Sequence, residues 1–536
     1  MTLKVAILAR RAELSQWQVE SLNIASRYLD VALYLVAPDK ASQTPEFQHM
    51  AYRLLTAFSL NNRLTRRATF AMPMEALQEL SLESGKDGLR LPFLVVDALI
   101  ARGITAIINF GPSIEPPAGL DVIAYASPGS IYYGGGAAGF EEMRAGAQCA
   151  EIRVEKHSAN TPVAAVLAHC YSRVYHHSYM RTASDYQHNA MLLLKPAMER
   201  LVVGDCLTTV ESCPRTEIPG NLAVMAFVFR MGHRYLRRLL YGALVEKRWN
   251  VIIAEFSGFV GLDNLSITRG RVPVLGKSHS FYADPFFSHD GQKIRLEALN
   301  KHNGVGEILE LDVDSLEPSE AYLTGWHYSY PFSFCENGRE YLLPEVSSHS
   351  EPYVIAAPFT EGAEVIPLEG FDGRRVLDGT LFIHDGYHYI FGGLDGSAES
   401  CLYLYYSQAL TGPYRAHPKN PIVIDPRLAR MGGRIQVVDG QIYRFGQNNS
   451  RGYGDGLTVC EIVSLSPDDY RERIVGSVGF VDACGPHTVD ISNGRMVMDF
   501  YTDTFSLFAG YRRLSARILR QLRGRKPNVG GGCRIL

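Results

Sequence analysis

Short apolar runs with the alternation of β-strands fill the C-terminal half of this chain, and they come in pairs joined by tight turns. An Asn-Gly or Asp-Gly dipeptide separates the two runs of each pair, and it favours a hairpin because both residues tolerate positive φ. The turn glycines are Gly291, Gly338, Gly386, Gly440 and Gly494. Their spacing of roughly 50 residues is that of propeller blades. The pattern therefore predicts a five-bladed β-propeller over residues 249–510.

The N-terminal half has a different pattern, in which short apolar strands alternate with amphipathic helices. Strands are predicted at 4–8, 31–36, 104–110 and 121–125, and helices at 14–29, 93–102 and 137–145. This alternation is typical of an α/β sheet. The predicted organisation is an α/β domain over 1–155, a helical connector over 156–248, the propeller, and a basic tail over 511–536.

Composition narrows the class of protein. The chain has 536 residues, too many for one core, with 46% apolar residues, 20% charged residues and a net charge of −3. It has neither an apolar stretch of about 18 residues nor an N-terminal segment of signal-peptide type, so neither a membrane span nor export is expected. Nine scattered cysteines without a Cys-x-x-Cys pair favour free thiols in a reducing cytoplasm over disulfides or a zinc site.

Three segments admit two interpretations each. Residues 223–249 form a predicted basic amphipathic helix, which suits either an anionic membrane surface or packing between domains with a solvated basic face. The tail 511–536 carries eight basic residues and no acidic one, and it suits either a solvated segment or an acidic lipid surface. Gly134-Gly135-Gly136 marks either a tight turn at a helix start or a phosphate cradle.

The candidate catalytic and substrate-binding residues lie where the innermost strands of the propeller begin, because these strands all face the central axis. Their first residues are Asp284, Tyr330, Asp378, Arg434 and His487, and the following strands bring Glu345 and Gln447 to the same end. Asp284, Glu345 and Asp378 are the predicted catalytic residues: one carboxylate acts as base, another as acid, and the third tunes pKa values by its charge. The predicted substrate-binding residues are Tyr282, Tyr330, Arg434, Gln447, Arg451, Tyr453 and His487. One such aspartate alone is better explained as a turn or cap residue, and repetition at equivalent blade positions makes the functional interpretation of Asp284, Glu345 and Asp378 an equal alternative. No metal site is predicted.

The propeller segment also resembles a known family over residues 270–475. The matching motifs are Phe281–Phe286, Tyr330–Phe332, Leu343–Ser347, Asp378–Phe382, Gly412–Tyr414, His417–Pro421, Arg430–Arg434, Tyr443–Gln447 and Tyr453–Gly454. They resemble the domain found in plant-type glucosamine inositolphosphorylceramide transferases and related bacterial proteins, and in general plan the five-bladed propeller of glycoside hydrolase family 43. The resemblance implies sugar chemistry, by transfer or by hydrolysis. The chain departs from the family at Gln447-Asn448-Asn449-Ser450, where Gln-Asp-Cys-Ser is expected, so one carboxylate is missing.

The N-terminal half resembles the formyltransferase fold through Ala106–Gly111, Tyr132–Gly135 and Gly139–Met143. The catalytic residues of that family are an Asn, a His and an Asp. The segments Ala124–Gly129 and Glu155–Ser158 stand where the His and the Asp are expected, so the catalytic set does not carry over. A binding or scaffolding role is expected instead.

Together these features predict a glycosyltransferase of cell-surface glycan or glycolipid biosynthesis, with its chemistry in the propeller. The donor is a sugar nucleotide or sugar phosphate, whose phosphate Arg434 and Arg451 would bind, and no other cofactor is predicted. The acceptor is a carbohydrate or a lipid-linked glycan, and no nucleic acid is expected. The expected location is the cytoplasm, with peripheral contact at an anionic inner membrane face. The alternatives are a family 43-like hydrolase and a noncatalytic carbohydrate-binding scaffold.

Overall fold

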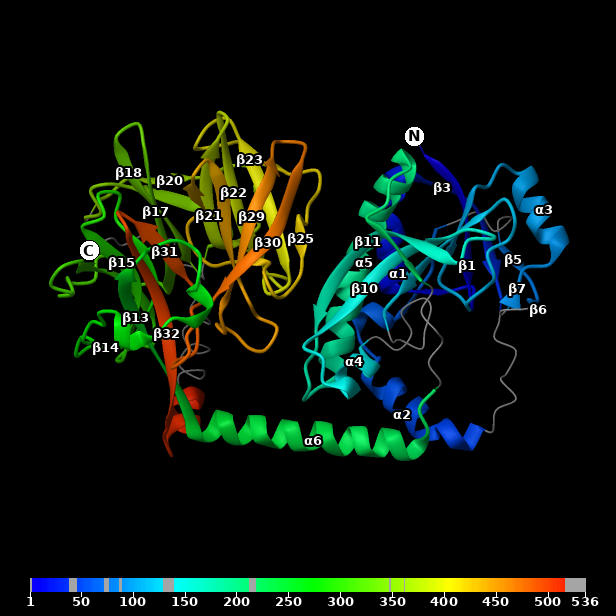
Figure 1. The fold of residues 1–536 in the computed structure, drawn as a ribbon, viewed down its shortest axis with the longest axis horizontal. Coiled ribbons are helices and arrows are strands. Elements are labelled where there is room, and N and C mark those ends of the chain that lie inside the picture. The colour runs from blue at the N-terminus through cyan, green and yellow to red at the C-terminus, as the bar shows by residue number, and fades with distance from the viewer. Residues whose placement is uncertain are drawn as a thin grey trace. The chain divides into compact units, whose positions relative to one another are not determined.

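The computed structural model describes residues 2–37, 46–71, 77–85, 89–128, 139–211, 218–346, 349–360 and 362–515. The chain forms two compact units, Met1–Arg237 and Arg238–Leu536. Figure 1 shows the mixed helices and strands of the first unit and the mainly β second unit. The long helix α6 (Asn221–Leu244) includes the boundary between them. None of the described helices has the length and apolar content to cross a membrane.

A mixed eight-stranded sheet forms the centre of the first unit, in the order β12-β11-β10-β9-β8-β1-β3-β5. The strands are β1 (Leu3–Ala9), β3 (Leu29–Val36), β5 (Leu77–Glu79), β8 (Ala106–Asn109), β9 (Asp121–Ala126), β10 (Cys149–His157), β11 (Val163–Arg173) and β12 (Thr208–Glu211). Two small ladders pair β2 (Leu14–Ser15) with β4 (Arg67–Ala68) and β6 (Glu83–Ser84) with β7 (Leu89–Arg90). Strands β9, β8, β1, β3 and β5 run parallel, whereas β10, β11 and β12 add antiparallel pairs. The central strands β1 and β8 are continuous apolar runs because the parallel sheet buries both of their faces.

Helices of the first unit are α1 (Gln16–Ile24), α2 (Met50–Ser59), α3 (Phe93–Ala101), α4 (Phe140–Ala145) and α5 (Tyr179–Val203). Two polar side chains near the formyltransferase-like segments form hydrogen bonds that fix the local structure. Asn109 Nδ2 donates to the carbonyl of Pro112. Ser127 Oγ donates to Glu142 Oε1 and to the carbonyl of Glu151. The formyltransferase resemblance itself stays a prediction.

The structure differs from the sequence-based pattern between residues 156 and 248, which was expected to be helical throughout. Strands β11 and β12 of the sheet lie in this range, and after α6 the propeller strand β13 (Val245–Glu255) begins. The run of alanine and valine in β11 has no decisive periodicity, and its pairing with β10 along Cys149–Lys156 selects the strand. The predicted helix 14–29 is also shorter, since α1 ends at Ile24. Gly134–Gly136 and the tail beyond residue 515 lie outside the described residues.

The second unit is a five-bladed β-propeller, as the repeat predicts. Blade 1 contains β14 (His279–Phe287), β15 (Lys293–Asn300) and β16 (Gly306–Asp312). Blade 2 contains β17 (Tyr328–Glu336), β18 (Arg339–Val346), β19 (Tyr353–Ala356) and β20 (Val365–Pro367). Blade 3 contains β21 (Val376–His384), β22 (Tyr387–Leu394), β23 (Cys401–Ser407), β24 (Arg415–Ala416) and β25 (Val423–Ile424). Blade 4 contains β26 (Arg430–Met431), β27 (Gln436–Val438), β28 (Gln441–Gln447), β29 (Leu457–Leu465) and β30 (Tyr470–Val478).

Blade 5 joins the beginning and the end of the propeller. It contains β31 (Val489–Ser492) and β32 (Arg495–Phe505), and β13 pairs with β32 from Val245↔Phe505 to Glu255↔Arg495. The strand that enters the propeller is thus bonded to the strand that leaves it. This pairing closes the ring and covers what would otherwise be an exposed sheet edge.

The hairpin turns follow the predicted chemistry in four of the five blades. Both turn residues have positive φ in Asn337-Gly338, Asp385-Gly386, Asp439-Gly440 and Asn493-Gly494, as a type I′ turn requires. In blade 1 only Gly291 has positive φ. There Ser288 Oγ donates to Asp290 Oδ1, so the first turn is longer and is stabilised by side chains.

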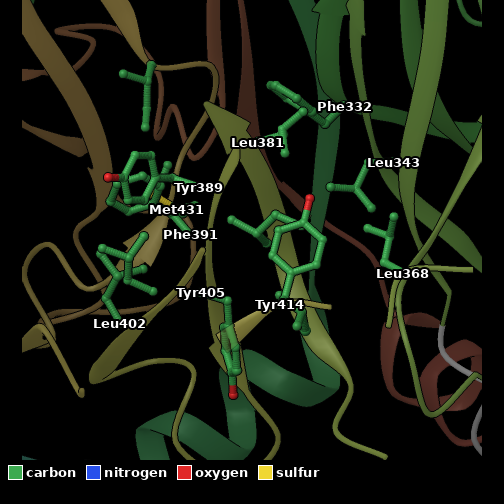
Figure 2. Packing of buried hydrophobic residues seen from close by; sticks show 14 of the residues in the cluster. Phe332, Leu343, Leu368, Leu381, Tyr389, Phe391, Leu402, Tyr405, Tyr414 and Met431 are labelled. Carbon is green, nitrogen blue, oxygen red and sulfur yellow. The ribbon is translucent and has the colours of Figure 1, made fainter. Parts of the chain in front are cut away.

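Apolar side chains between the sheets hold the blades together. Figure 2 shows one such cluster, in which Phe332 and Leu343 of blade 2 lie near Leu381 and Phe391 of blade 3, with Met431 of blade 4 in the same cluster. All five side chains are buried. Close packing of this kind fixes the sheets relative to one another, and so it fixes where the innermost strands begin.

Candidate active site at the start of the innermost strands

A repeated backbone irregularity aims side chains into the centre of the propeller. Strands β14, β17 and β21 each shift register after their first residues, and Asp284, Tyr330 and Asp378 lie in these bulges with φ of 50°, 45° and 51°. A bulge bends its strand and re-aims the extra side chain. Aspartate tolerates this left-handed conformation, whereas for tyrosine it costs roughly 1–2 kcal/mol.

Contacts across the channel hold Tyr330 in this conformation. Its hydroxyl lies 2.9 Å from Thr380 Oγ1 and accepts a hydrogen bond of 2.9 Å from the amide of Gly433. Its ring packs edge-on against Phe286, with the ring centroids 4.8 Å apart. Tyr330 is completely buried. It therefore fills the channel and links blades 2, 3 and 4, instead of facing a substrate as predicted.

Asp284, His487 and Asp499 form a buried row of ionisable groups. His487 Nε2 lies 3.3 Å from Asp284 Oδ1, and His487 Nδ1 lies 2.5 Å from Asp499 Oδ2. Thr488 Oγ1 also donates to Asp284 Oδ1 at 2.8 Å, and the amide of Tyr330 donates to Asp284 Oδ2 at 3.3 Å. These contacts fix the Asp284 carboxylate in one orientation.

Asp378 is the centre of a second group. Arg430 donates to both of its carboxylate oxygens through Nε and Nη2, and Gln447 Nε2 donates to Asp378 Oδ2 at 3.0 Å. The amide of Asp378 in turn donates to Glu345 Oε2 at 3.1 Å. Asp378 is therefore neutralised by a guanidinium, while Glu345 forms no ion pair within the described part of the chain. The structure thus brings together all three predicted catalytic residues and the predicted binding residues Gln447, His487 and Tyr453.

Charge imbalance sets the protonation states of this site. Five carboxyl groups face two basic groups, and the carboxyl groups belong to Asp284, Glu297, Glu345, Asp378 and Asp499. Burial and then the charge of Asp378 raise the pKa of Glu345 to about 8, against the opposing effect of Arg430. Burial and the neighbouring carboxylates also raise the pKa of Glu297 well above its usual value. Glu345 therefore carries a proton at neutral pH and is able to donate it.

Burial and neighbouring charges also shift the pKa values of Asp284 and His487. Burial raises the pKa of Asp284, while the charge of His487 opposes that rise. Burial lowers the pKa of His487, but the charges of Asp499 and Asp284 outweigh it, so the net shift is upward. The net shift of the Asp284 pKa is also upward, because burial and the charges of Asp378 and Asp499 outweigh the charge of His487. The arrangement thus offers a proton donor at Glu345 and, at Asp284, a carboxyl group whose ionised form His487 and Thr488 stabilise.

Asp284, His487 and Asp499 also have the donor types of a cation site. One ligand atom from each lies within 4.8 Å of the other two. Carboxylate and imidazole donors suit a divalent transition metal. His487 contacts both carboxylates, and its single positive charge offsets one of their two negative charges.

Arg434 does not lie with the catalytic candidates. Its Nε donates to Asp490 Oδ1 at 2.9 Å, and its Nη1 donates to the carbonyl of Ser333. Ser333 follows Tyr330 by three residues along the innermost strand, so Arg434 lies about 10 Å farther down the channel. There it lines a cavity of about 340 Å³ whose walls include Phe287 and Phe332. The predicted role of Arg434 in binding a donor phosphate stays a prediction, and its guanidinium lies beside Asp490 and the carbonyl of Ser333.

Tyr282, Arg451 and Tyr453 occupy three different environments. Tyr282 is buried in the apolar cluster between blades 1 and 5, where its hydroxyl accepts from the amide of Gly276, so it lines no binding surface. The Arg451 side chain is 64% exposed and lies 3.8 Å from Asp455. Tyr453 is 41% exposed, and its ring contacts both His487 and Arg430. Tyr453 therefore connects the buried groups with solvent.

Sequence reasoning missed four residues of the site: Glu297, Arg430, Thr488 and Asp499. A signal for two of them exists in the repeat. Glu297 lies near the end of the second strand of its blade, as Glu345 and Gln447 do in theirs, and Asp499 lies on the corresponding strand β32. Comparison of the second strands would have singled out these two. Nothing in the repeat distinguishes Arg430 from Arg434.

Comparison with known proteins places the similarity in the propeller. Residues 259–483 match the family model described as glucosamine inositolphosphorylceramide transferase 1, N-terminal. The transferase of this name from Arabidopsis thaliana is 30% identical over 232 residues, which are 40% of this chain and 30% of the relative. That from Oryza sativa subsp. japonica is 28% identical over 215 residues, 37% of this chain and 28% of the relative. The chain thus spans about 30% of the length of these relatives.

Solved structures with a similar fold include two glycoside hydrolases. One is CoXyl43, a family 43 β-xylosidase/α-arabinofuranosidase from a compost microbial metagenome, with 12% identity, a TM-score of 0.31, and coverage of 44% of this chain and 92% of that one. The other is Zg3597, of family 117, from Zobellia galactanivorans, with 10% identity, a TM-score of 0.30, and coverage of 48% and 90%. Residues 259–483 of this chain are therefore similar to the N-terminal domain of the glucosamine inositolphosphorylceramide transferases.

Proposed function

We propose that this protein is a glycosyltransferase of cell-surface glycan or glycolipid biosynthesis, with its reaction in the propeller. The observation that carries the proposal is that one buried site contains Asp284, which His487 and Thr488 hold in place, and Glu345, whose pKa of about 8 keeps it protonated at neutral pH. Such a pair suits the removal of a proton from an attacking hydroxyl and the protonation of a leaving group. The names of the similar proteins, which are transferases, support transfer as the reaction.

In the proposed reaction an acceptor hydroxyl attacks the anomeric carbon of the donor sugar. The new bond joins the acceptor oxygen to this carbon, and the bond between the carbon and the donor phosphate oxygen breaks. The proton of the hydroxyl passes to Asp284, which Thr488 and His487 orient. Glu345 donates its proton toward the leaving oxygen. The acceptor is a carbohydrate or lipid-linked glycan, and the donor is a sugar nucleotide or sugar phosphate.

Arg451 is the remaining candidate for the donor phosphate. Arg430 lies nearer to the carboxyl groups, but it is already bound to Asp378 through two nitrogens. The guanidinium of Arg451 is exposed and has only a long 3.8 Å contact to Asp455. Arg451 precedes by two residues Tyr453, whose ring contacts His487 and Arg430, and an exposed arginine in this segment suits a phosphate that stays in solvent.

The test is product formation by the purified chain with a panel of sugar nucleotides and glycolipid acceptors, inositolphosphorylceramide among them. Mass spectrometry of the lipid fraction should show a sugar-shifted product that disappears in the Asp284→Asn variant. Asp439→Asn, a change in an exposed hairpin turn, is the matched control and should retain activity. Absence of transfer together with cleavage of aryl furanosides or xylosides would replace the proposal by hydrolysis.

Hydrolysis is the second candidate, and one observation favours it. The two cations in the centre of the site, Arg430 and His487, are both bound to carboxylates, which leaves no cation there for a phosphate. Water would then replace the acceptor hydroxyl, with the same acid and base. A hydrolase needs no nucleotide, so tight binding of a sugar nucleotide in calorimetry supports transfer. A noncatalytic scaffold would bind sugars unchanged in Asp284→Asn and show no turnover in the parent.

A further inference from the structure

Trp326 lies at the end of the propeller where the carboxyl groups of the candidate site are buried. It belongs to the connection between blades 1 and 2, two residues before strand β17. The next residue contacts the site directly, since His327 Nε2 lies 3.8 Å from Glu297 Oε1. Within β17, Ser329 pairs with Glu345 of the second strand. Trp326 is therefore at the rim of the site, close in the chain to residues that contact Glu297 and Glu345.

The structure distinguishes Trp326 from the other aromatic residues at this end of strands β14 and β17. Tyr282, Tyr328 and Tyr330 are completely buried, whereas Trp326 is 37% exposed. The ring of His349 packs edge-on against the indole, with the ring centroids 6.0 Å apart and the planes at 86°. This contact fixes the position of the indole, and part of its surface stays open to solvent. An aromatic side chain held in this way offers a large apolar surface to a ligand.

A second exposed aromatic ring lies on the opposite side of the site. Tyr453 is in the connection between β28 and β29 of blade 4, and its ring centroid lies 5.3 Å from that of His487. In a ring of five blades, blade 4 lies opposite the junction of blades 1 and 2. The carboxyl groups of Asp284 and Glu345 therefore lie between two exposed aromatic side chains, Trp326 and Tyr453.

We propose that Trp326 binds a sugar ring of the substrate other than the reacting one, by stacking of the indole against the C–H face of that ring. Aromatic side chains bury large apolar areas, and a sugar ring presents an apolar face. Asp284 is buried and the indole is exposed at the rim, so a ring that reacts at the carboxyl groups lies deeper than a ring on the indole. The substrate class is therefore a glycan of two or more sugar rings. The inference rests on the proposed function for its carbohydrate ligand, and it applies equally to transfer and to hydrolysis.

Intrinsic fluorescence and calorimetry of the full chain test this. The chain has three tryptophans, of which Trp17 and Trp249 are buried, so a fluorescence change on binding is expected from Trp326 and should disappear in Trp326→Phe. The probes are glucose, xylose and mannose and the disaccharides cellobiose, xylobiose and mannobiose. At least one disaccharide should bind more tightly than its monosaccharide. Trp326→Ala should weaken binding of that disaccharide roughly 3–10-fold and change binding of the monosaccharide by less than about twofold.

Two further variants separate stacking from structural effects. Trp326→Tyr keeps an aromatic ring and should recover most of the disaccharide affinity. Ile383→Ala removes an exposed apolar side chain near the hairpin end of β21, at the other end of the propeller, and should leave binding unchanged.

Three results overturn the inference: unchanged disaccharide affinity in Trp326→Ala, an equal loss for monosaccharide and disaccharide, or no binding of any of the six sugars. A fluorescence change that persists in Trp326→Phe also counts against it. Binding is measured without turnover, so disaccharide binding through Trp326 in a chain that transfers no sugar would refute the proposed transfer and support the inference.

Discussion

Replacement of Glu345 by Gln should raise the stability of the propeller more at alkaline pH than at acidic pH. Glu345 has a pKa of about 8 in the folded protein because it is buried beside the charge of Asp378. In the unfolded chain its pKa returns to the ordinary value near 4.3. Between these two values the folded state binds more protons than the unfolded state, so stability falls as pH rises. Glutamine is uncharged throughout and lacks this pH dependence.

The size of the effect follows from the pKa difference. Each unit corresponds to about 1.36 kcal/mol, so a rise from about pH 5.5 to above 8 costs wild type at most about 3.4 kcal/mol. The carboxyl groups of the site titrate together, so the part assigned to Glu345 is expected to be about 1–3 kcal/mol. The hydrogen bond that Glu345 accepts from the amide of Asp378 survives, because the glutamine oxygen also accepts. In a domain of this size the gain corresponds to roughly 2–8 °C in melting temperature.

Thermal unfolding of wild type and Glu345→Gln at about pH 5.5 and pH 8.5 measures this difference directly. The exposed Glu320→Gln is the matched control and should show the same difference from wild type at both pH values. A pH-independent difference between wild type and Glu345→Gln would refute the assignment of a buried, protonated carboxyl group. In the proposed reaction the same variant should lose turnover at every pH, because it cannot donate a proton.

Three further predictions follow from the same contacts. Asp284→Asn should lower turnover by at least about a hundredfold with a small change in melting temperature, measured by steady-state kinetics and calorimetry. Arg434→Met should destabilise the propeller by about 3–5 kcal/mol, because it leaves the fully buried Asp490 unpaired, and urea unfolding checks this. Arg451→Gln should instead weaken donor binding and leave unfolding unchanged; the opposite pattern for the two arginines would show that their positions are misassigned. Tyr330→Phe should cost about 1–3 kcal/mol in unfolding free energy, because Thr380 and the amide of Gly433 lose their partner, and an unchanged value would contradict the role of its hydroxyl.

The sequence was sufficient for the fold class and for the main elements of both units. Hairpin turns are local, and the Asn-Gly or Asp-Gly pair has positive φ at both residues in four of the five blades, Asp385-Gly386 and Asn493-Gly494 among them. The parallel strands β1 and β8 could also be predicted from the sequence, because a strand that is buried on both faces is mostly apolar. Strand β11 could not be predicted from the sequence, because alanine and valine suit either a helix or a strand. Only its pairing with β10 selects the strand.

The candidate site, like the fold, was determined partly by local sequence and partly by tertiary structure. The sequence by itself determined the blade repeat, and with it that Asp284 and Asp378 begin innermost strands. Tertiary structure decided which groups meet there. Bulges of one residue aim these two carboxylates at the axis, and blade closure brings Asp499 of the last blade to Asp284 of the first. Arg430 binds Asp378 whereas Arg434 binds Asp490, although only four positions separate them. The physical reason is that the conformation of a turn depends on residues adjacent in sequence, whereas the ion-pair partner of a charged side chain depends on its position along the strand and on the packing between blades.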